Sequence, residues 1–309
     1  MKKRWLIVAA VVIVLALLPL FISSPYVIHI LNLTFLYIVA ATSFRTIVIS
    51  GQFPLGHGAF MGIGAYASAM AAKWLGLSPW ISIPFGTAVA CAVGIVIGLP
   101  FARLRAVYYA MVSLFFNMGI VQVIHSLGRW SGGYSGLTGI PTLLGFSKTP
   151  YYFCFLFLCL LSILVLYRFE HSRIGITWKA IAQSYLIAWS VGINERFYRV
   201  FAVAIGCFFA GLVGALYAHY NGVIGTATFS FMATFMLLMF CVIGGMRSFL
   251  GPIIGTSVLV LVPEIFRSLK QFSPYLAAGI MIFVVFFLPQ GLVSLPGLML
   301  RKMGKRHAP

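Results

Sequence analysis

The sequence predicts an all-α integral membrane protein, a polytopic bundle of about eight to ten transmembrane helices. Of its 309 residues, 62% are hydrophobic and only 8% are charged, whereas a soluble domain carries about 25% charged residues. Apolar runs of helical length recur along the whole chain, and about 20 such residues span a hydrocarbon core of about 30 Å. The runs lack the alternation of barrel strands, so helices are the expected spanning elements.

Ten apolar runs define the candidate spans. They lie at 5–22, 27–49, 58–75, 80–102, 107–127, 151–168, 198–218, 232–246, 250–267 and 274–290. The runs 58–75 and 107–127 hold enough glycine and polar residues to be re-entrant or broken helices, which leaves the number of full crossings between eight and ten. The whole chain, 1–309, is expected to form a single transmembrane domain.

Basic residues predict the orientation. Three cations at positions 2–4 precede the first run, which no small-residue cleavage pattern closes, so this run is expected to be an uncleaved span with a cytoplasmic N-terminus. Ten crossings then place the C-terminus in the cytoplasm, in agreement with the basic cluster at 301–306. Arg267 and Lys270 fall on the outer side and count mildly against this topology.

The formal net charge of +18 would raise the question of nucleic-acid binding in a soluble chain. Here the basic residues fall in short clusters between apolar runs. This is the distribution that cytoplasmic loops have under the positive-inside rule. The charge therefore indicates membrane topology and not a nucleic-acid partner.

The chain offers few groups for catalysis. Its three acids are Glu170, Glu195 and Glu264, and no span holds two of them. Its six histidines form no i, i+4 pair, and a GxxxxGK[ST] loop for ATP is missing from the sequence. The five cysteines lie inside apolar runs without CxxC spacing, which indicates buried free thiols. We therefore expect a non-enzymatic chain with no metal site and no cofactor of its own.

Polar residues inside two apolar runs are candidates for a solute pathway. Gln52 and His57 accompany a glycine cluster, and a helix broken at mid-membrane can turn its backbone groups toward a solute. Asn117 and Gln122 should face protein or a water-filled path and not lipid. Two other interpretations remain open: close packing of helices for the glycines and interhelical hydrogen bonds for the polar side chains. Glycines at small-xxx-small spacing include Gly58 with Gly62, Gly94 with Gly98, and Gly251 with Gly255.

Two charged residues in apolar runs need an explanation. Glu264 follows Pro263 in the ninth run, and an ionisable group inside a membrane often marks an ion path. That interpretation would make the chain a stand-alone secondary transporter or channel; the other pairs Glu264 with Arg267, three residues later, at a helix end. Arg45 in the second run is expected to extend its side chain to the inner interface.

Two loops and one repeated motif complete the pattern. The outer loop 128–150 is rich in glycine, which predicts turns, and the middle of the inner loop 168–199 has helical periodicity, which predicts a docking segment. The segments 51–56 and 245–251 share a few residues at an offset of five crossings. They indicate an inverted repeat, as many transporters have, or a chance match.

Five segments, in order, resemble the branched-chain amino acid ABC transporter permeases, specifically the LivM-type subunit. The first, GQFPLGHGAFMGIGAY at 51–66, is similar to the family's GQxSLGHAAFxGIGAY. The others are YYAMVSL at 108–114, GGYSGLTGIP at 132–141, GLVGALYA at 211–218 and GGMRSFLGP at 244–252. The resemblance covers about residues 30 to 295.

The resemblance implies a multi-pass subunit of the bacterial inner membrane that pairs with a second, related permease. Its further partners would be two ATP-binding subunits, which bind and hydrolyse the ATP, and an extracytoplasmic solute-binding protein. The expected function is half of the pathway for ATP-driven import of a small amphiphilic solute. Branched-chain amino acids come first, with urea, amides and other amino acids as alternatives. Gln52, His57, Asn117 and Gln122 would line or gate that path.

Residues 175–192, within an inner loop at about 169–198, look like the family's cytoplasmic coupling segment. The positions expected to transmit the ATPase's motion are Gly175, Lys179, Ala180, Gln183 and Gly192. The family tends to carry arginine and acidic residues here, whereas this chain keeps Lys179 and has no carboxylate in the segment. The departure predicts apolar docking or a divergent partner in place of charge-paired docking.

Overall fold

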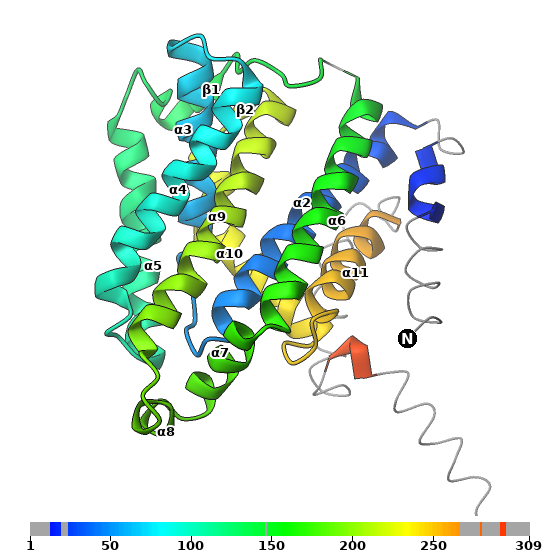
Figure 1. Ribbon diagram of the computed structural model, residues 1–309. Helices are drawn as coiled ribbons and strands as arrows, with labels where there is room; N and C mark the ends of the chain where they lie inside the picture. The colour runs from blue at the N-terminus through cyan, green and yellow to red at the C-terminus, as the bar shows by residue number, and fades with distance from the viewer. Residues whose placement is uncertain (1–12, 20–23, 146, 266–278, 280–290, 295–309) are drawn as a thin grey trace, which may run out of the picture.

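The structure is a computed structural model that describes residues 13–19, 24–145, 147–265, 279 and 291–294. Its helices run side by side between two ends of a bundle (Figure 1). One end carries two short helices and is named here the α7–α8 end; the other carries a two-stranded sheet and is named the β end. Of the predicted spans 5–22 and 274–290, only 13–19, which is helical, and residue 279 lie within the described residues.

The other eight predicted spans correspond to helices, and each predicted boundary lies within three residues of the observed one. The helices are α2 Pro25–Val48, α3 His57–Trp74, α4 Pro79–Phe101, α5 Ala106–Ser126, α6 Lys148–Glu170, α9 Glu195–Asn221, α10 Phe231–Gly244 and α11 Gly251–Ile265. Among the described residues, α2, α4, α5, α6 and α9 are long and apolar enough to cross a membrane, while α10 and α11 are shorter. The fold is that of a polytopic helical membrane protein.

Local sequence sets where several helices begin and end. Pro25 and Pro79 occupy the first turns of α2 and α4, where a missing N–H has no cost and a fixed φ favours the helix. Asn194 caps α9 by accepting a hydrogen bond from the backbone N–H of Phe197 at 3.3 Å. The same helix ends at Gly222, whose φ of 70° is the left-handed conformation of a glycine C-cap.

Glycine contacts bring α3, α4 and α9 together. A β-carbon on Gly64 would collide with the backbone of Gly211, and one on Gly214 would collide with the backbone of α3. A β-carbon on Gly94 of α4 would lie 2.6 Å from Cβ of Cys207 on α9. Close packing is therefore the role of these glycines, of which Gly94 belongs to a predicted small-xxx-small pair.

The glycine-rich loop 128–150 forms turns at the β end, as predicted. β1 (Leu137–Thr138) pairs antiparallel with β2 (Val223–Ile224), with Leu137 opposite Ile224. The loop also contains the short 3₁₀ helix η1 (Gly133–Ser135), and its glycines include six with positive φ, at positions 128, 132, 133, 136, 139 and 145. A second 3₁₀ helix, η2 (Thr226–Phe229), follows β2 and leads the chain to α10.

The predicted docking segment is helical. It forms α7 (Arg173–Gln183) and α8 (Tyr185–Ser190), which lie at one end of the bundle (Figure 1). Trp178 is fully buried, and its indole N–H donates to the backbone oxygen of Tyr198 on α9 at 2.8 Å. This contact fixes the inward face of α7 on the bundle.

The two segments that suggested an inverted repeat lie at the same end of the bundle. Segment 51–56 follows α2 directly and reaches α7, because a β-carbon on Gly51 would lie 3.1 Å from Cα of Ala182. Segment 245–251 lies beside the same end of α2, where Arg45 donates to the backbone oxygen of Met246 at 2.8 Å. Inversion would place them at opposite ends, so these two segments do not support an inverted repeat.

Candidate functional site

Helix α3 begins inside the bundle and not at its surface. His57, the first residue of α3, is fully buried, and its Nε2 is hydrogen-bonded to Oγ of Ser43 at 3.0 Å. Ser43 lies five residues before the end of α2 at Val48, so residues 49–56 turn back into the bundle before α3 starts. The sequence left 58–75 open as a broken or re-entrant helix; α3 is continuous from His57 to Trp74, and the chain before it is the part that turns back into the bundle. Helix α5, the other such candidate, is continuous.

The first turns of α3 and α10 meet α5 at one place. The backbone N–H of Gly58 donates to Oγ1 of Thr234 at 2.7 Å. The side-chain amide of Asn117 donates to the backbone oxygen of Phe229 at 3.5 Å, and a β-carbon on Gly58 would lie 3.0 Å from that same oxygen. We name His57, Gly58, Asn117, Phe229 and Thr234 the junction; all five residues are buried.

The junction and its approach hold buried polar atoms that lack partners. Within the described part of the chain, Nε2 of Gln52, Nδ1 of His57 and Oδ1 of Asn117 have no hydrogen-bond partner. An unsatisfied buried donor or acceptor costs about 1–3 kcal/mol. The N-terminal ends of α3 and α10 add a partial positive charge at the same place. These atoms and helix ends can therefore hydrogen-bond a polar group.

Three of the four predicted pathway residues are therefore buried, and the fourth is not. Gln52 precedes α3, His57 begins it, and Asn117 on α5 donates to the backbone oxygen of Phe229. Gln122 lies on α5 but faces outward, on the same exposed side of the helix as Gly119. The structure does not bring Gln122 to the junction.

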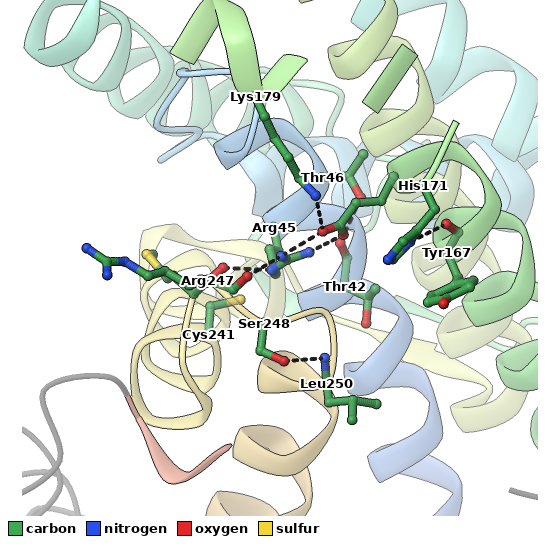
Figure 2. A network of polar contacts seen from close by, with 12 residues as sticks. Thr42, Arg45, Thr46, Tyr167, His171, Lys179, Cys241, Arg247, Ser248 and Leu250 are labelled. Carbon is green, nitrogen blue, oxygen red and sulfur yellow. Dashed lines mark hydrogen bonds and ion pairs between the residues drawn. The ribbon is translucent and has the colours of Figure 1, made fainter. Parts of the chain in front are cut away.

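A buried ion pair lies at the α7–α8 end, where α2 and α6 finish (Figure 2). The guanidinium of Arg45 is 1% exposed and binds both carboxylate oxygens of Glu170, one of them at 3.1 Å. It also donates to the backbone oxygens of Met246 at 2.8 Å and Arg247 at 3.2 Å. The expectation that the Arg45 side chain extends to the inner interface is wrong, because a buried carboxylate from α6 and two carbonyls hold its head inside the protein.

Lys179 connects α7 to this pair. Its Nζ lies 3.0 Å from Oε1 of Glu170, and its own side chain is half exposed. Gly175 adds a close contact, since a β-carbon there would collide with the backbone oxygen of Glu170. We name Arg45, Glu170, Lys179 and the carbonyls of Met246 and Arg247 the ion network. The predicted coupling segment has no carboxylate of its own, and the one that Lys179 contacts comes from the end of α6.

The remaining predicted coupling residues face outward. Ala180 and Gln183 are exposed, and with Ile176, which is 64% exposed, they form one helical face of α7 at i, i+4, i+7 spacing. Gly192 follows α8 with a φ of 82°, which suits glycine. α7 therefore has an inward face fixed by charge and packing and an outward face open to a partner.

Sequence reasoning missed the ion network and Thr234. The signal for the first was present: one arginine inside an apolar run and one of only three acids two residues past the end of another run. Opposite charges at the ends of two spans favour each other strongly in a low dielectric. Thr234 gave no such signal, because a threonine in an apolar helix is ordinary.

Glu264 lies away from both sites. Its Oε1 accepts a hydrogen bond from the hydroxyl of Tyr26 at the start of α2. The alternative partner, Arg267, lies outside the described residues. Over the described ranges, no three His, Cys, Asp or Glu side chains gather to hold a metal ion.

Comparison of the sequence with known proteins finds similarity over a range that includes the junction and the ion network. Residues 26–289 match the family described as branched-chain amino acid transport system / permease component. The chain belongs to this family. This permease is also similar to the high-affinity branched-chain amino acid transport system permease protein LivM of Escherichia coli (strain K12), with 30% identity over 95% of this chain and 76% of the relative. The protein of the same name from Salmonella typhimurium (strain LT2) is 28% identical over the same shares.

No solved structure matches this permease. The family range contains every residue of the junction and of the ion network. Membership makes the chain a multi-pass transport subunit and not an enzyme, and it does not favour the alternative of a stand-alone transporter that uses Glu264.

Proposed function

We propose that this permease forms half of the transmembrane pathway for ATP-driven import of branched-chain amino acids. The observation that carries the proposal is the family match over 26–289, which includes the buried polar junction. Its setting would be the inner membrane of a bacterium, with both termini and the α7–α8 end in the cytoplasm. The substrate is inferred from the names of the family and its relatives, and urea, amides and other amino acids are the competing solutes.

The junction is the proposed constriction of the path. Two hydrogen bonds close it, from Gly58 to Thr234 and from Asn117 to Phe229. When they separate, the N-terminal end of α3, the hydroxyl of Thr234 and the amide of Asn117 become available to a passing zwitterion. His57 and Gln52 extend this polar lining toward the α7–α8 end. Gln122 would line the path from the side that the second permease closes.

Segment 49–56 is the proposed mechanical link between the coupling segment and the junction. One end rests on α7, through Gly51 and Ala182. The other end is fixed beside α5, where a β-carbon on Gly56 would lie 2.5 Å from the backbone oxygen of Ser113. Because both end residues are glycines, the backbone of the segment contacts α7 and α5 directly, with no flexible side chain in between. A displacement of α7 would therefore reach the junction through about six residues of chain.

The partners follow from the family. A second permease would complete the pathway, two ATP-binding subunits would bind and hydrolyse the ATP, and an extracytoplasmic binding protein would deliver the solute. The outward face of α7, at Ile176, Ala180 and Gln183, is the proposed contact with one ATP-binding subunit. Two of these three side chains, Ile176 and Ala180, are apolar, which fits apolar docking, while Lys179 is engaged by Glu170.

Uptake by the assembled transporter tests the proposal. The permease is reconstituted in liposomes with its operon partners, and uptake of leucine, isoleucine and valine is compared with uptake of urea and acetamide, with and without internal ATP. We expect uptake of the three amino acids that requires ATP and stops when residues 176–190 are deleted. ATP-independent flux abolished by Glu264→Gln would establish the stand-alone alternative, and preferential urea uptake would change the substrate.

A further inference from the structure

A cavity of about 750 Å³ opens at the α7–α8 end. Its wall is formed by α8, by Arg105 directly before α5, and by the chain from Gly192 to the first residues of α9. Figure 1 shows α8 beneath the ends of α5 and α9. The side chains that give it chemical character are Arg105, Tyr185, Leu186, Trp189, Glu195 and Arg196. None of them belongs to the junction or to the ion network.

The cavity carries excess positive charge. Arg105 is half exposed, and its guanidinium lies 3.5 Å from the centre of the Tyr185 ring, which leaves the N–H edges of the fork accessible. The carboxylate of Glu195 is 3.7 Å from Arg105, longer than a good hydrogen bond, and is shared with Arg199 at 4.0 Å. Arg196 is exposed and makes no ion pair within the described residues. Arg105 and Arg196 thus line the cavity with a single carboxylate, that of Glu195, which also lies near Arg199. This excess of positive charge favours an anionic ligand.

The cavity lies where the apolar spans end. Arg105 immediately precedes α5 and Arg196 lies in the first turn of α9, and both helices are apolar and long enough to cross a membrane. The exposed apolar side chains next to these arginines are Val107 on α5 and Phe197 on α9, each 62% exposed. Aromatic rings at this level, as Trp189 provides, are typical of the interface between hydrocarbon and water.

We propose that this cavity binds the phosphate group of an anionic membrane phospholipid. Arg105 and Arg196 hold the phosphate, since a guanidinium fork matches phosphate geometry, and the acyl chains lie along Val107 and Phe197. Basic pockets beside transmembrane helices suit anionic head groups in this way. The inference rests on the proposed membrane placement of the α7–α8 end.

The bound lipid would act on the coupling segment. Tyr185, Leu186 and Trp189 of α8 line the cavity, so a head group between α8 and the bundle holds α8 in place through contacts on both sides. An acidic loop of the ATP-binding subunit and a soluble phosphate share part of this chemistry. They differ from a lipid in having no acyl chain to occupy the apolar surface.

Lipid binding by the full-length permease tests the proposal. The probe is a fluorescent phosphatidylglycerol added to the purified chain in detergent, with fluorescent phosphatidylcholine as the uncharged reference. We expect saturable binding of phosphatidylglycerol that weakens about tenfold or more in Arg105→Gln/Arg196→Gln. The matched control, Arg168→Gln/Arg173→Gln, removes two exposed arginines of the same end outside the cavity and should bind like wild type.

Four outcomes would overturn the proposal. They are equal loss in the control variant, equal binding of phosphatidylcholine, displacement by inorganic phosphate at concentrations that leave micelles intact, and displacement by the purified ATP-binding subunit. A second variant, Arg105→Lys/Arg196→Lys, guards against misfolding: it keeps the charge, and partial recovery of binding supports the cavity. Amino-acid uptake is not a readout here, so failure of lipid binding leaves the proposed import function intact. Failure of amino-acid uptake would likewise leave the lipid proposal intact.

Discussion

Glu170→Gln removes the only carboxylate that faces the buried Arg45 among the described residues. The Arg45 guanidinium keeps its hydrogen bonds to the backbone oxygens of Met246 and Arg247. It loses the negative carboxylate that it bound through both oxygens and faces a neutral amide instead. Breaking a buried pair by removing one partner costs about 3–5 kcal/mol. Because glutamine can still accept one hydrogen bond, we expect a loss near the lower limit, about 3 kcal/mol in the free energy of unfolding.

Two further variants isolate the buried pair. Lys179 is half exposed, so Lys179→Met should change the free energy of unfolding by about 0–1 kcal/mol, the range for exposed ion pairs. A buried pair can often be replaced by apolar residues of similar volume at little cost. We therefore expect the double variant Arg45→Met/Glu170→Met to be more stable than either single replacement.

Buried thiols provide the assay. Cys241 is fully buried, and its thiol donates to the backbone oxygen of Ala41, one helical turn before Arg45. Thermal unfolding of the purified chain, followed with a thiol-reactive fluorophore, should show a midpoint lowered by roughly 6–12 °C in Glu170→Gln. A midpoint within about 2 °C of wild type, or a double variant no more stable than the singles, would refute this account of the ion network.

Three other perturbations address packing, the junction and transmission. Gly214→Ala should destabilise by about 1–3 kcal/mol because its β-carbon meets the backbone of α3; Gly119→Ala, with no described atom within 4 Å of its β-carbon, is the control for this thermal measurement. Asn117→Leu removes Oδ1, which has no partner, together with one long hydrogen bond from the side-chain amide to the backbone oxygen of Phe229, so we expect only a small loss in thermal midpoint but leucine uptake reduced about tenfold, and unchanged uptake would exclude Asn117 from the path. Gly51→Val disturbs the contact with Ala182 at a φ of 83°; ATP hydrolysis should continue while uptake falls, and a parallel loss of both would argue against segment 49–56 as the link.

Most of the secondary structure could be predicted because the cost of transferring a residue into hydrocarbon depends on that residue. Eight spans followed from hydropathy alone to within three residues. The break before α3 was also visible, in the glycine and polar residues of 51–58. The start of α10 inside the bundle was not, because Phe231–Gly244 reads as an ordinary apolar run; only its contact with Gly58 shows where it begins.

The sequence by itself determined a helical membrane protein, the approximate bounds of its spans, the family and three buried polar residues of the candidate path. Only the tertiary structure decided which charges meet. Arg45 and Glu170 are 125 residues apart. The local sequence pattern places Arg45 within the span 27–49 and Glu170 just beyond the end of the span 151–168. They pair because α2 and α6 pack together and end at the same level, where a low dielectric makes an isolated charge costly and a partner necessary.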